Sequence, residues 1–161
     1  MPNVEYERDN FSISSDKARL QIDMIYQFLT KSYWAKGIPL PIVRKSIQHS
    51  LCFGVYAGKR DGEKQIGFGR VITDRATFAY IADIFILDPY RGRGLSKWLM
   101  ECIMAHPDLQ DLRGWMLATR DAHGLYRQFG FETLTNPERI MAIRNPDVYR
   151  RYAQPDDSSA E

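Results

Sequence analysis

The first fifty residues carry a short alternating piece followed by hydrophobic positions at helical spacing. Phe11 and Ile13 alternate with polar residues, and Ser14, Ser15 and Asp16 follow them, so the sequence predicts that an extended piece gives way to a capped helix. One face of that helix is apolar, at the spacing i, i+3, i+4 and i+7: Ile22, Ile25, Tyr26 and Leu29. We expect this helix to end before Gly37 and a second one to open at Pro41.

The pattern changes between residues 51 and 87, where apolar runs are rich in β-branched and aromatic residues. Three such runs are separated by turn-forming residues at 58–62 and 73–76: Leu51–Tyr56, Gln65–Thr73 and Thr77–Leu87. Loops of this length join neighbouring antiparallel strands. The segment therefore predicts a three-stranded antiparallel meander.

Helical and strand patterns alternate in the last third of the chain. A helix with an apolar stripe at Leu95, Trp98, Leu99, Cys102 and Ile103 is predicted to stop at Pro107. After it we expect a strand at Trp115–Thr119, a short helix at Ala122–Phe129 capped by Asp121, a left-handed Gly130, and last strands at Phe131–Leu134 and Arg139–Ile143. The order predicts an α/β (α+β) fold: a mixed, mostly antiparallel central sheet flanked by helices.

Composition narrows the class of protein. With 161 residues, 44% of them hydrophobic, the chain has the size of one domain, expected over residues 1–153, with a disordered polar tail at 154–161. A formal charge of +2 does not favour nucleic-acid binding. No apolar run approaches the roughly 20 residues of a membrane span, and the charged N-terminus does not resemble a signal peptide. Cys52 and Cys102 lie in apolar stretches, which favours a reducing compartment, so we expect a cytoplasmic protein without a metal or a membrane partner.

The segment Arg91-Gly92-Arg93-Gly94-Leu95-Ser96 follows a predicted strand and enters a predicted helix. Such a junction directs main-chain N–H groups and the positive end of a helix dipole toward one point, which suits a phosphate. The two glycines permit close approach, and the two arginines add positive charge. An ordinary tight turn with solvated arginines is the alternative.

This turn resembles the signature of the GNAT superfamily of N-acetyltransferases, which reads Gln or Arg, two free positions, Gly, one free position, then Gly or Ala. Arg91, Gly94 and Ser96 occupy the three fixed positions, and Ser96 departs from the signature while remaining small. The order of predicted elements also matches the family. So does the segment from Ala122 to Phe131, a short helix that bears a tyrosine and ends in Gly-Phe.

The resemblance implies acetyl-CoA as co-substrate, held on the turn and between two splayed parallel strands, where Ile86 and its neighbours offer main-chain groups to it. It also implies that Tyr126 is the general acid, although a buried aromatic residue is the alternative. Asp83 is an acid among apolar residues, so it is either the general base or a carboxylate paired with a nearby Arg or Lys. Tyr33 and Trp34 lie on the loop that forms an acceptor wall in the family, where aromatic rings suit an amine, although core packing explains them equally well.

The sequence therefore predicts an N-acetyltransferase that transfers acetyl directly to a primary amine of a small molecule or peptide. A non-catalytic acyl-CoA-binding regulatory module is the alternative from another class. An acetyl-cysteine intermediate at Cys52 or Cys102 is a third, disfavoured because neither cysteine has a base in its own segment. His123 is a weaker candidate base, the acceptor cannot be named, and a homodimer is left open.

Overall fold

A single six-stranded sheet with the order β1-β2-β3-β4-β5-β6 organises the chain, and the computed structural model describes residues 2–153 of it. Its strands are β1 Glu5–Arg8, β2 Phe11–Ser14, β3 Leu51–Ala57, β4 Lys64–Thr73, β5 Phe78–Ile86 and β6 Gly114–Leu117. The first five pair antiparallel in sequence order, and only β5 and β6 are parallel. The predicted mixed, mostly antiparallel sheet is confirmed, and the predicted meander is β3, β4 and β5.

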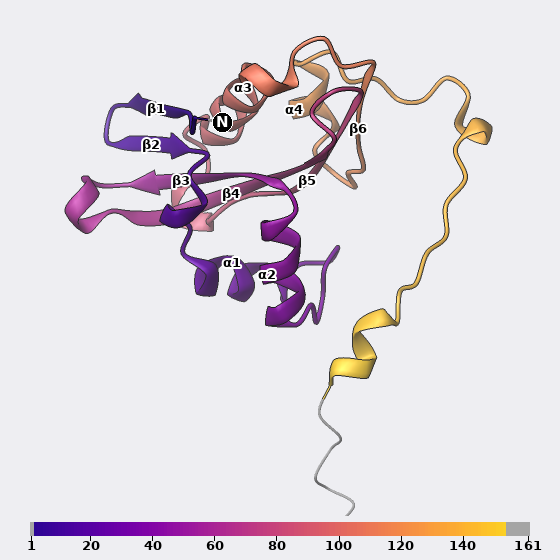
Figure 1. The fold of residues 1–161 in the computed structure, drawn as a ribbon, viewed down its shortest axis with the longest axis horizontal. Coiled ribbons are helices and arrows are strands. Elements are labelled where there is room, and N and C mark those ends of the chain that lie inside the picture. The colour runs from indigo at the N-terminus through magenta and orange to yellow at the C-terminus, as the bar shows by residue number, and fades with distance from the viewer. Residues whose placement is uncertain (1, 154–161) are drawn as a thin grey trace, which may run out of the picture.

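Helices cover both faces of the sheet (Figure 1). On one face lie α3 Leu95–Met104 and the short α4 His123–Arg127, and on the other lie α1 Ile22–Leu29 and α2 Leu40–Gln48. Two buried clusters result. One joins α3 to the sheet through residues such as Leu99 and Ile103, and the other joins α1 and α2 to it through Ile25 and Val43. Burial of these apolar stripes is the main force that holds the layers together.

Helix boundaries follow the predicted signals in part. Pro41 lies in the first turn of α2, as expected. The Asp16 side chain accepts a hydrogen bond from the Ala18 N–H, but it caps a short 3-10 helix, Lys17–Arg19, and α1 begins only at Ile22. The predicted cap at Asp121 is wrong: Ala122 precedes α4 without a side-chain cap, and its N–H donates to Thr119 Oγ1 at 3.0 Å. Gly130 is left-handed, with φ 88°, as predicted.

The predicted last strands, Phe131–Leu134 and Arg139–Ile143, are not formed. Residues 132–147 are all exposed, and the one regular piece among them is a 3-10 turn at Pro137–Arg139. The chain leaves α4, runs away from the body and returns below it as a second 3-10 helix, Val148–Tyr152 (Figure 1). Isolated extended segments gain no stability without a partner strand. The predicted tail at 154–161 lies outside the described residues.

Candidate active site

The strand β5 and the helix α3 are joined by the glycine turn that the sequence singled out. Gly92 and Gly94 have φ values of 78° and 74°, a left-handed conformation that costs other residues energy. Gly94 is the N-cap of α3, and no side chain caps that helix end. A Cβ built on either glycine would meet no atom within 4 Å. The turn is therefore an open main-chain cradle at a helix N-terminus, the arrangement that binds phosphate.

Side chains of the same turn hold it in place. Arg91 donates from Nε to the Ile86 carbonyl oxygen at 2.9 Å and pairs through Nη1 with Asp88 at 2.7 Å. The Arg93 guanidinium lies 5.9 Å from the centre of the Tyr90 ring. Leu95 is buried in the core and contributes only its main chain to the cradle. Both Arg91 and Arg93 therefore keep their positive charge beside the main-chain cradle.

The two parallel strands, β5 and β6, separate toward the end of the sheet that carries the glycine turn. The ladder between β5 and β6 stops at the pair Ile81 and Leu117, whereas β5 continues to Ile86. A pocket of about 1290 Å³ occupies the opening and is lined by both strands. Seven of the predicted site residues line this pocket: Tyr33, Trp34, Asp83, Ile86, Arg91, Ser96 and Tyr126. The other four, Gly92, Arg93, Gly94 and Leu95, lie in the turn between Arg91 and Ser96.

A β-bulge aims Asp83 into the pocket. The register between β4 and β5 shifts between Phe68 and Arg70, and Asp83 has a φ of 55°, uncommon for a residue in a strand. Its Oδ2 accepts from Arg70 Nε and its Oδ1 from Trp34 Nε1, both at 2.8 Å. The carboxylate is therefore paired with an arginine, and each oxygen retains a lone pair directed elsewhere.

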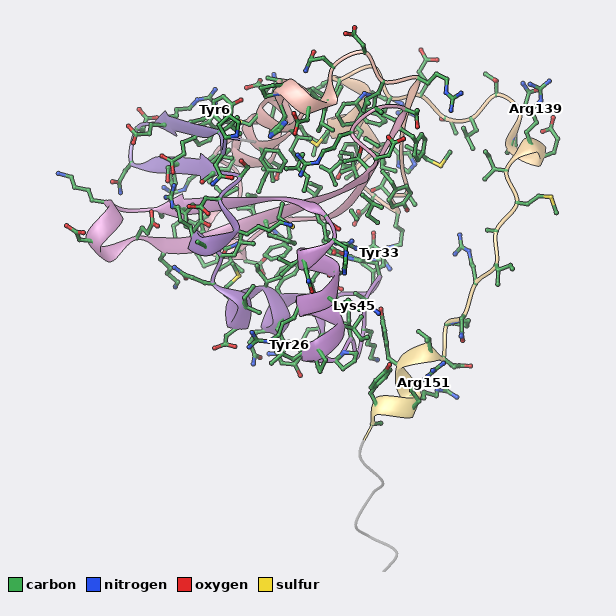
Figure 2. The ribbon with its side chains drawn as sticks, viewed as in Figure 1. Tyr6, Tyr26, Tyr33, Lys45, Arg139 and Arg151 are labelled. Atoms are coloured by element: carbon green, nitrogen blue, oxygen red, sulfur yellow. The ribbon has the colours of Figure 1, made fainter. Side chains whose placement is uncertain are left out.

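The predicted aromatic wall of Tyr33 and Trp34 is present, but one face of the Tyr33 ring is covered by Arg120. The Arg120 guanidinium lies 3.9 Å from the centre of the Tyr33 ring, and Trp34 packs against Tyr33 at 5.1 Å between ring centres. An acceptor ammonium would have to displace Arg120 to use that face of Tyr33 for a cation–π contact. Figure 2 shows Tyr33 on the side of the body that faces the returning end of the chain.

Tyr126 is held in α4 with its ring buried and 8% of the residue exposed. Its ring packs against Phe131 at 6.0 Å, and the Phe131 N–H donates to its carbonyl oxygen. Burial raises the pKa of the Tyr126 hydroxyl to about 12, and the nearby Tyr33 and Asp121 act in the same direction. The phenol is therefore protonated at neutral pH and can donate a proton into the pocket.

Four cations in the lining were not predicted from the sequence: Lys36, Arg70, Arg120 and Arg144. Arg70 pairs with Asp83, and among residues 2–153 none of the other three forms an ion pair with a carboxylate. Arg120 could have been found, because it directly follows the predicted strand Trp115–Thr119, and ligands of open α/β sheets bind at the carboxyl ends of strands. Arg144 also follows a predicted strand, Arg139–Ile143, but that strand is not formed, so the same reasoning does not account for its place in the lining. His123 is exposed and does not line the pocket.

These features define a class of protein. Its members have a mixed sheet whose two parallel strands separate around a pocket, and a glycine turn places a helix N-terminus at the rim of that pocket. Comparison with known proteins agrees with it. Residues 49–133 match the family model described as "Acetyltransferase (GNAT) domain". A curated Gibberella zeae protein named "Putative acetyltransferase" is 30% identical, over 75% of this chain and 78% of that protein. The chain therefore belongs to the GNAT family of acetyltransferases.

Solved structures share the fold along most of the chain. A Xanthomonas campestris pv. campestris protein of the GNAT family is 47% identical, with a TM-score of 0.81 over 89% of this chain and 99% of that one. A GNAT acetyltransferase from Elizabethkingia anophelis, solved with acetyl-CoA bound, is 16% identical, with a TM-score of 0.58 over 92% and 89% of the two chains. Within residues 2–153 no helix is long and apolar enough to cross a membrane, and no cluster of metal-ligating side chains is found there.

Proposed function

We propose that this chain transfers the acetyl group of acetyl-CoA directly to a primary amine. The observation that carries the proposal is the single pocket that adjoins the phosphate-type cradle and contains both Tyr126 and Asp83. Its volume of about 1290 Å³ exceeds the roughly 300–1,000 Å³ of a site for one small ligand. That size supports simultaneous binding of co-substrate and acceptor, as direct transfer requires.

In this proposal each residue type supplies one requirement of the reaction. Acetyl-CoA brings the acetyl group as a thioester. The main chain of Gly92 to Ser96 binds its phosphates, and the free edge of β5 beyond Ile81 hydrogen-bonds its arm. Tyr126 holds, on its hydroxyl, the proton that the leaving sulfur needs, and Asp83 accepts the proton of the amine, either directly or through a water molecule.

Burial of both cysteines argues against the covalent alternative. Cys52 and Cys102 are 1% and 3% exposed. Desolvation raises the pKa of each thiol to about 12, so neither supplies a thiolate at neutral pH, and the thiolate is the form that attacks a thioester. Neither cysteine lines the pocket.

The charges of the lining support a narrower acceptor class. Five cations, Lys36, Arg70, Arg91, Arg120 and Arg144, face two carboxylates, Asp83 and Asp121. Asp83 is engaged by Arg70, and Arg91 belongs to the cradle. The surplus of positive charge disfavours a polyamine and favours an amine that also carries an acidic group, because opposite charges select the ligand.

The experiment that tests the proposed function is an acceptor screen with acetyl-CoA. We expect release of free coenzyme A with amino acids or other acid-bearing amines, at a higher kcat/KM than with polyamines. A thermal shift by acetyl-CoA without turnover on any amine of a broad panel would instead support the non-catalytic acyl-CoA-binding module. Faster turnover of polyamines would contradict the charge-based acceptor class while leaving the amine proposal intact.

A pH–rate profile tests the proposed role of Asp83. We expect Asp83→Asn to lower kcat/KM below the pH at which the acceptor amine is already neutral, and to converge on the wild type above it, because a base is needed only while a proton must be removed. Trp34→Phe is the matched control, since it removes one hydrogen bond to Asp83 and leaves the carboxylate. A profile of Asp83→Asn parallel to that of the wild type at every pH would make Asp83 a structural partner of Arg70.

A further inference from the structure

Tyr33 and Arg120 form a stacked pair in the lining of the pocket. The Arg120 guanidinium lies 3.9 Å from the centre of the Tyr33 ring, and both residues line the pocket. Tyr33 is 51% exposed and Trp34 beside it is 42% exposed, so burial in the core does not account for these two rings. A pocket uses a small number of placed polar groups to orient its ligand, and an exposed arginine held on an aromatic ring is such a group.

The position of Arg120 is fixed, but its charge has no acid partner. Arg120 lies in the loop directly after β6, where the Ala122 N–H donates to Thr119 Oγ1 at 3.0 Å and holds the main chain on both sides of it. Among residues 2–153 no carboxylate pairs with Arg120, and this includes the neighbouring Asp121. A guanidinium has five N–H donors in a rigid fork. The fork of Arg120 is therefore held in the pocket without an acceptor for these donors.

The other cations of the lining lack one of these two properties. Arg70 and Arg91 each pair with an aspartate, so their charges are already matched. Lys36 and Arg144 are unpaired, but in the described part of the chain no aromatic ring lies against either of them. Within residues 2–153, only Arg120 among the lining cations combines a contact that holds it with an unmatched charge.

The stack lies beside the residues proposed to carry out the chemistry. Burial has the largest effect on the pKa of Tyr126, and Tyr33 is close enough to raise that pKa further. On its other side Tyr33 packs against Trp34 at 5.1 Å between ring centres, and Trp34 Nε1 donates to Asp83 Oδ1 at 2.8 Å. Two aromatic rings therefore connect Arg120 to the carboxylate proposed as the base, at the acetyl end of the pocket and not at the phosphate cradle.

We propose that Arg120 binds the carboxylate of an amino acid acceptor, whose amine lies at Asp83. A carboxylate meets a guanidinium through two parallel charge-assisted hydrogen bonds, which fix the orientation of the molecule as well as its affinity. The aromatic wall then holds a cation of the protein instead of the ammonium group of the substrate, and Tyr33 is the positioning residue for Arg120. Acetylation of this ligand rests on the proposed function, whereas its binding at Arg120 does not.

The first test uses pairs of acceptors that differ in the charge of one group. The acceptors are the L-amino acids and their α-carboxamides, each assayed with acetyl-CoA. We expect Arg120→Gln to lower the acid-to-amide ratio of kcat/KM by about 10–100-fold, the effect of losing hydrogen bonds to a charged group, mainly through a higher KM for the acids. Comparing this ratio between variant and wild type cancels the difference in amine basicity between an acid and its amide.

Arg127→Gln is the matched control, because Arg127 is exposed on α4 and does not line the pocket. Its acid-to-amide ratio should equal that of the wild type. An Arg120→Gln enzyme with the wild-type ratio overturns the proposal. So does an Arg120→Gln enzyme that keeps this ratio and loses affinity for acetyl-CoA, because that result assigns Arg120 to the phosphates of the cofactor.

Two substitutions at Tyr33 test its positioning role. Tyr33→Leu removes the ring on which Arg120 lies, and Tyr33→Phe retains that ring. We expect the Leu variant to lower the acid-to-amide ratio in the same direction as Arg120→Gln, and the Phe variant to keep the wild-type ratio. A Tyr33→Leu enzyme with the wild-type ratio overturns the role of Tyr33.

Equilibrium binding separates this inference from the proposed function. Calorimetry measures the Kd of each L-amino acid for the protein with and without saturating coenzyme A, so no turnover takes place. We expect at least one amino acid to bind the wild type and to bind Arg120→Gln about 10–100-fold more weakly. Binding that depends on Arg120 without acetylation of any amine overturns the proposed function and supports the subsite. Acetylation of amines with an acid-to-amide ratio independent of Arg120 supports the function and overturns the subsite.

Discussion

Tyr126→Phe is expected to lower kcat by about 10²–10⁴-fold, the usual contribution of a general acid, while the Kd for acetyl-CoA changes little. The ring is buried against Phe131, so phenylalanine preserves the packing and removes only the hydroxyl. Because burial raises the pKa of that hydroxyl to about 12, the wild-type phenol keeps its proton through the neutral and mildly alkaline range. Its deprotonation therefore gives no loss of rate until the pH approaches that value.

Single-turnover rates and calorimetric titration of acetyl-CoA measure the two effects separately. Tyr80→Phe is the matched control, because Tyr80 also lines the pocket and the substitution removes the same hydroxyl group. It should retain a wild-type kcat. A Tyr126→Phe enzyme that turns over within a few-fold of the wild type would assign the tyrosine to packing and require another proton donor.

Gly94→Asp is expected to abolish measurable acetyl-CoA binding. A Cβ at Gly94 points into open space at the cradle, so the new carboxylate would lie where the phosphates are proposed to bind. Placing like charges together costs several kcal/mol, which corresponds to an affinity loss of at least about 100-fold. Calorimetry with acetyl-CoA measures the loss, and the melting temperature of the free protein checks that it is folded.

Gly94→Asn separates charge from strain. Asn and Asp have similar size, and both tolerate the left-handed backbone better than other residues with side chains. The Asn variant should therefore retain much more affinity than the Asp variant. Equal losses in the two variants would mean that the turn needs glycine for its shape alone, and wild-type affinity in a folded Asp variant would remove the cradle from the cofactor site.

Local sequence patterns were enough to predict the elements whose packing partners are close in sequence. β3, β4 and β5 follow alternating or continuous apolar runs joined by short loops, and α3 follows a clear apolar stripe. β1 was not predicted because Glu5–Arg8 holds one apolar residue among charged ones. A single apolar position does not establish the alternation that marks a strand. Residues 139–143 have the pattern of a strand, but such a pattern does not say which neighbouring strand would pair with it.

The candidate site also has one part that could be predicted from the sequence and one part that could not. The glycine turn was readable because all its determinants are contiguous, from Arg91 to Ser96. The partners of Asp83 were not, since Arg70 and Trp34 are 13 and 49 residues away and meet it only through the bulge and the loop after α1. The position of Arg120 over Tyr33 likewise depends on how a loop crosses the end of β6.

The two edges of the sheet differ in a way that bears on solubility. β1, at one edge, carries Glu5, Glu7 and Arg8, and charged edge residues discourage the pairing of one sheet edge with another. β6, at the opposite edge, is the apolar stretch Gly114–Leu117. Growth of the sheet by added strands is therefore directed to the β6 side, so association of folded copies through a sheet edge is expected to start there and not at β1.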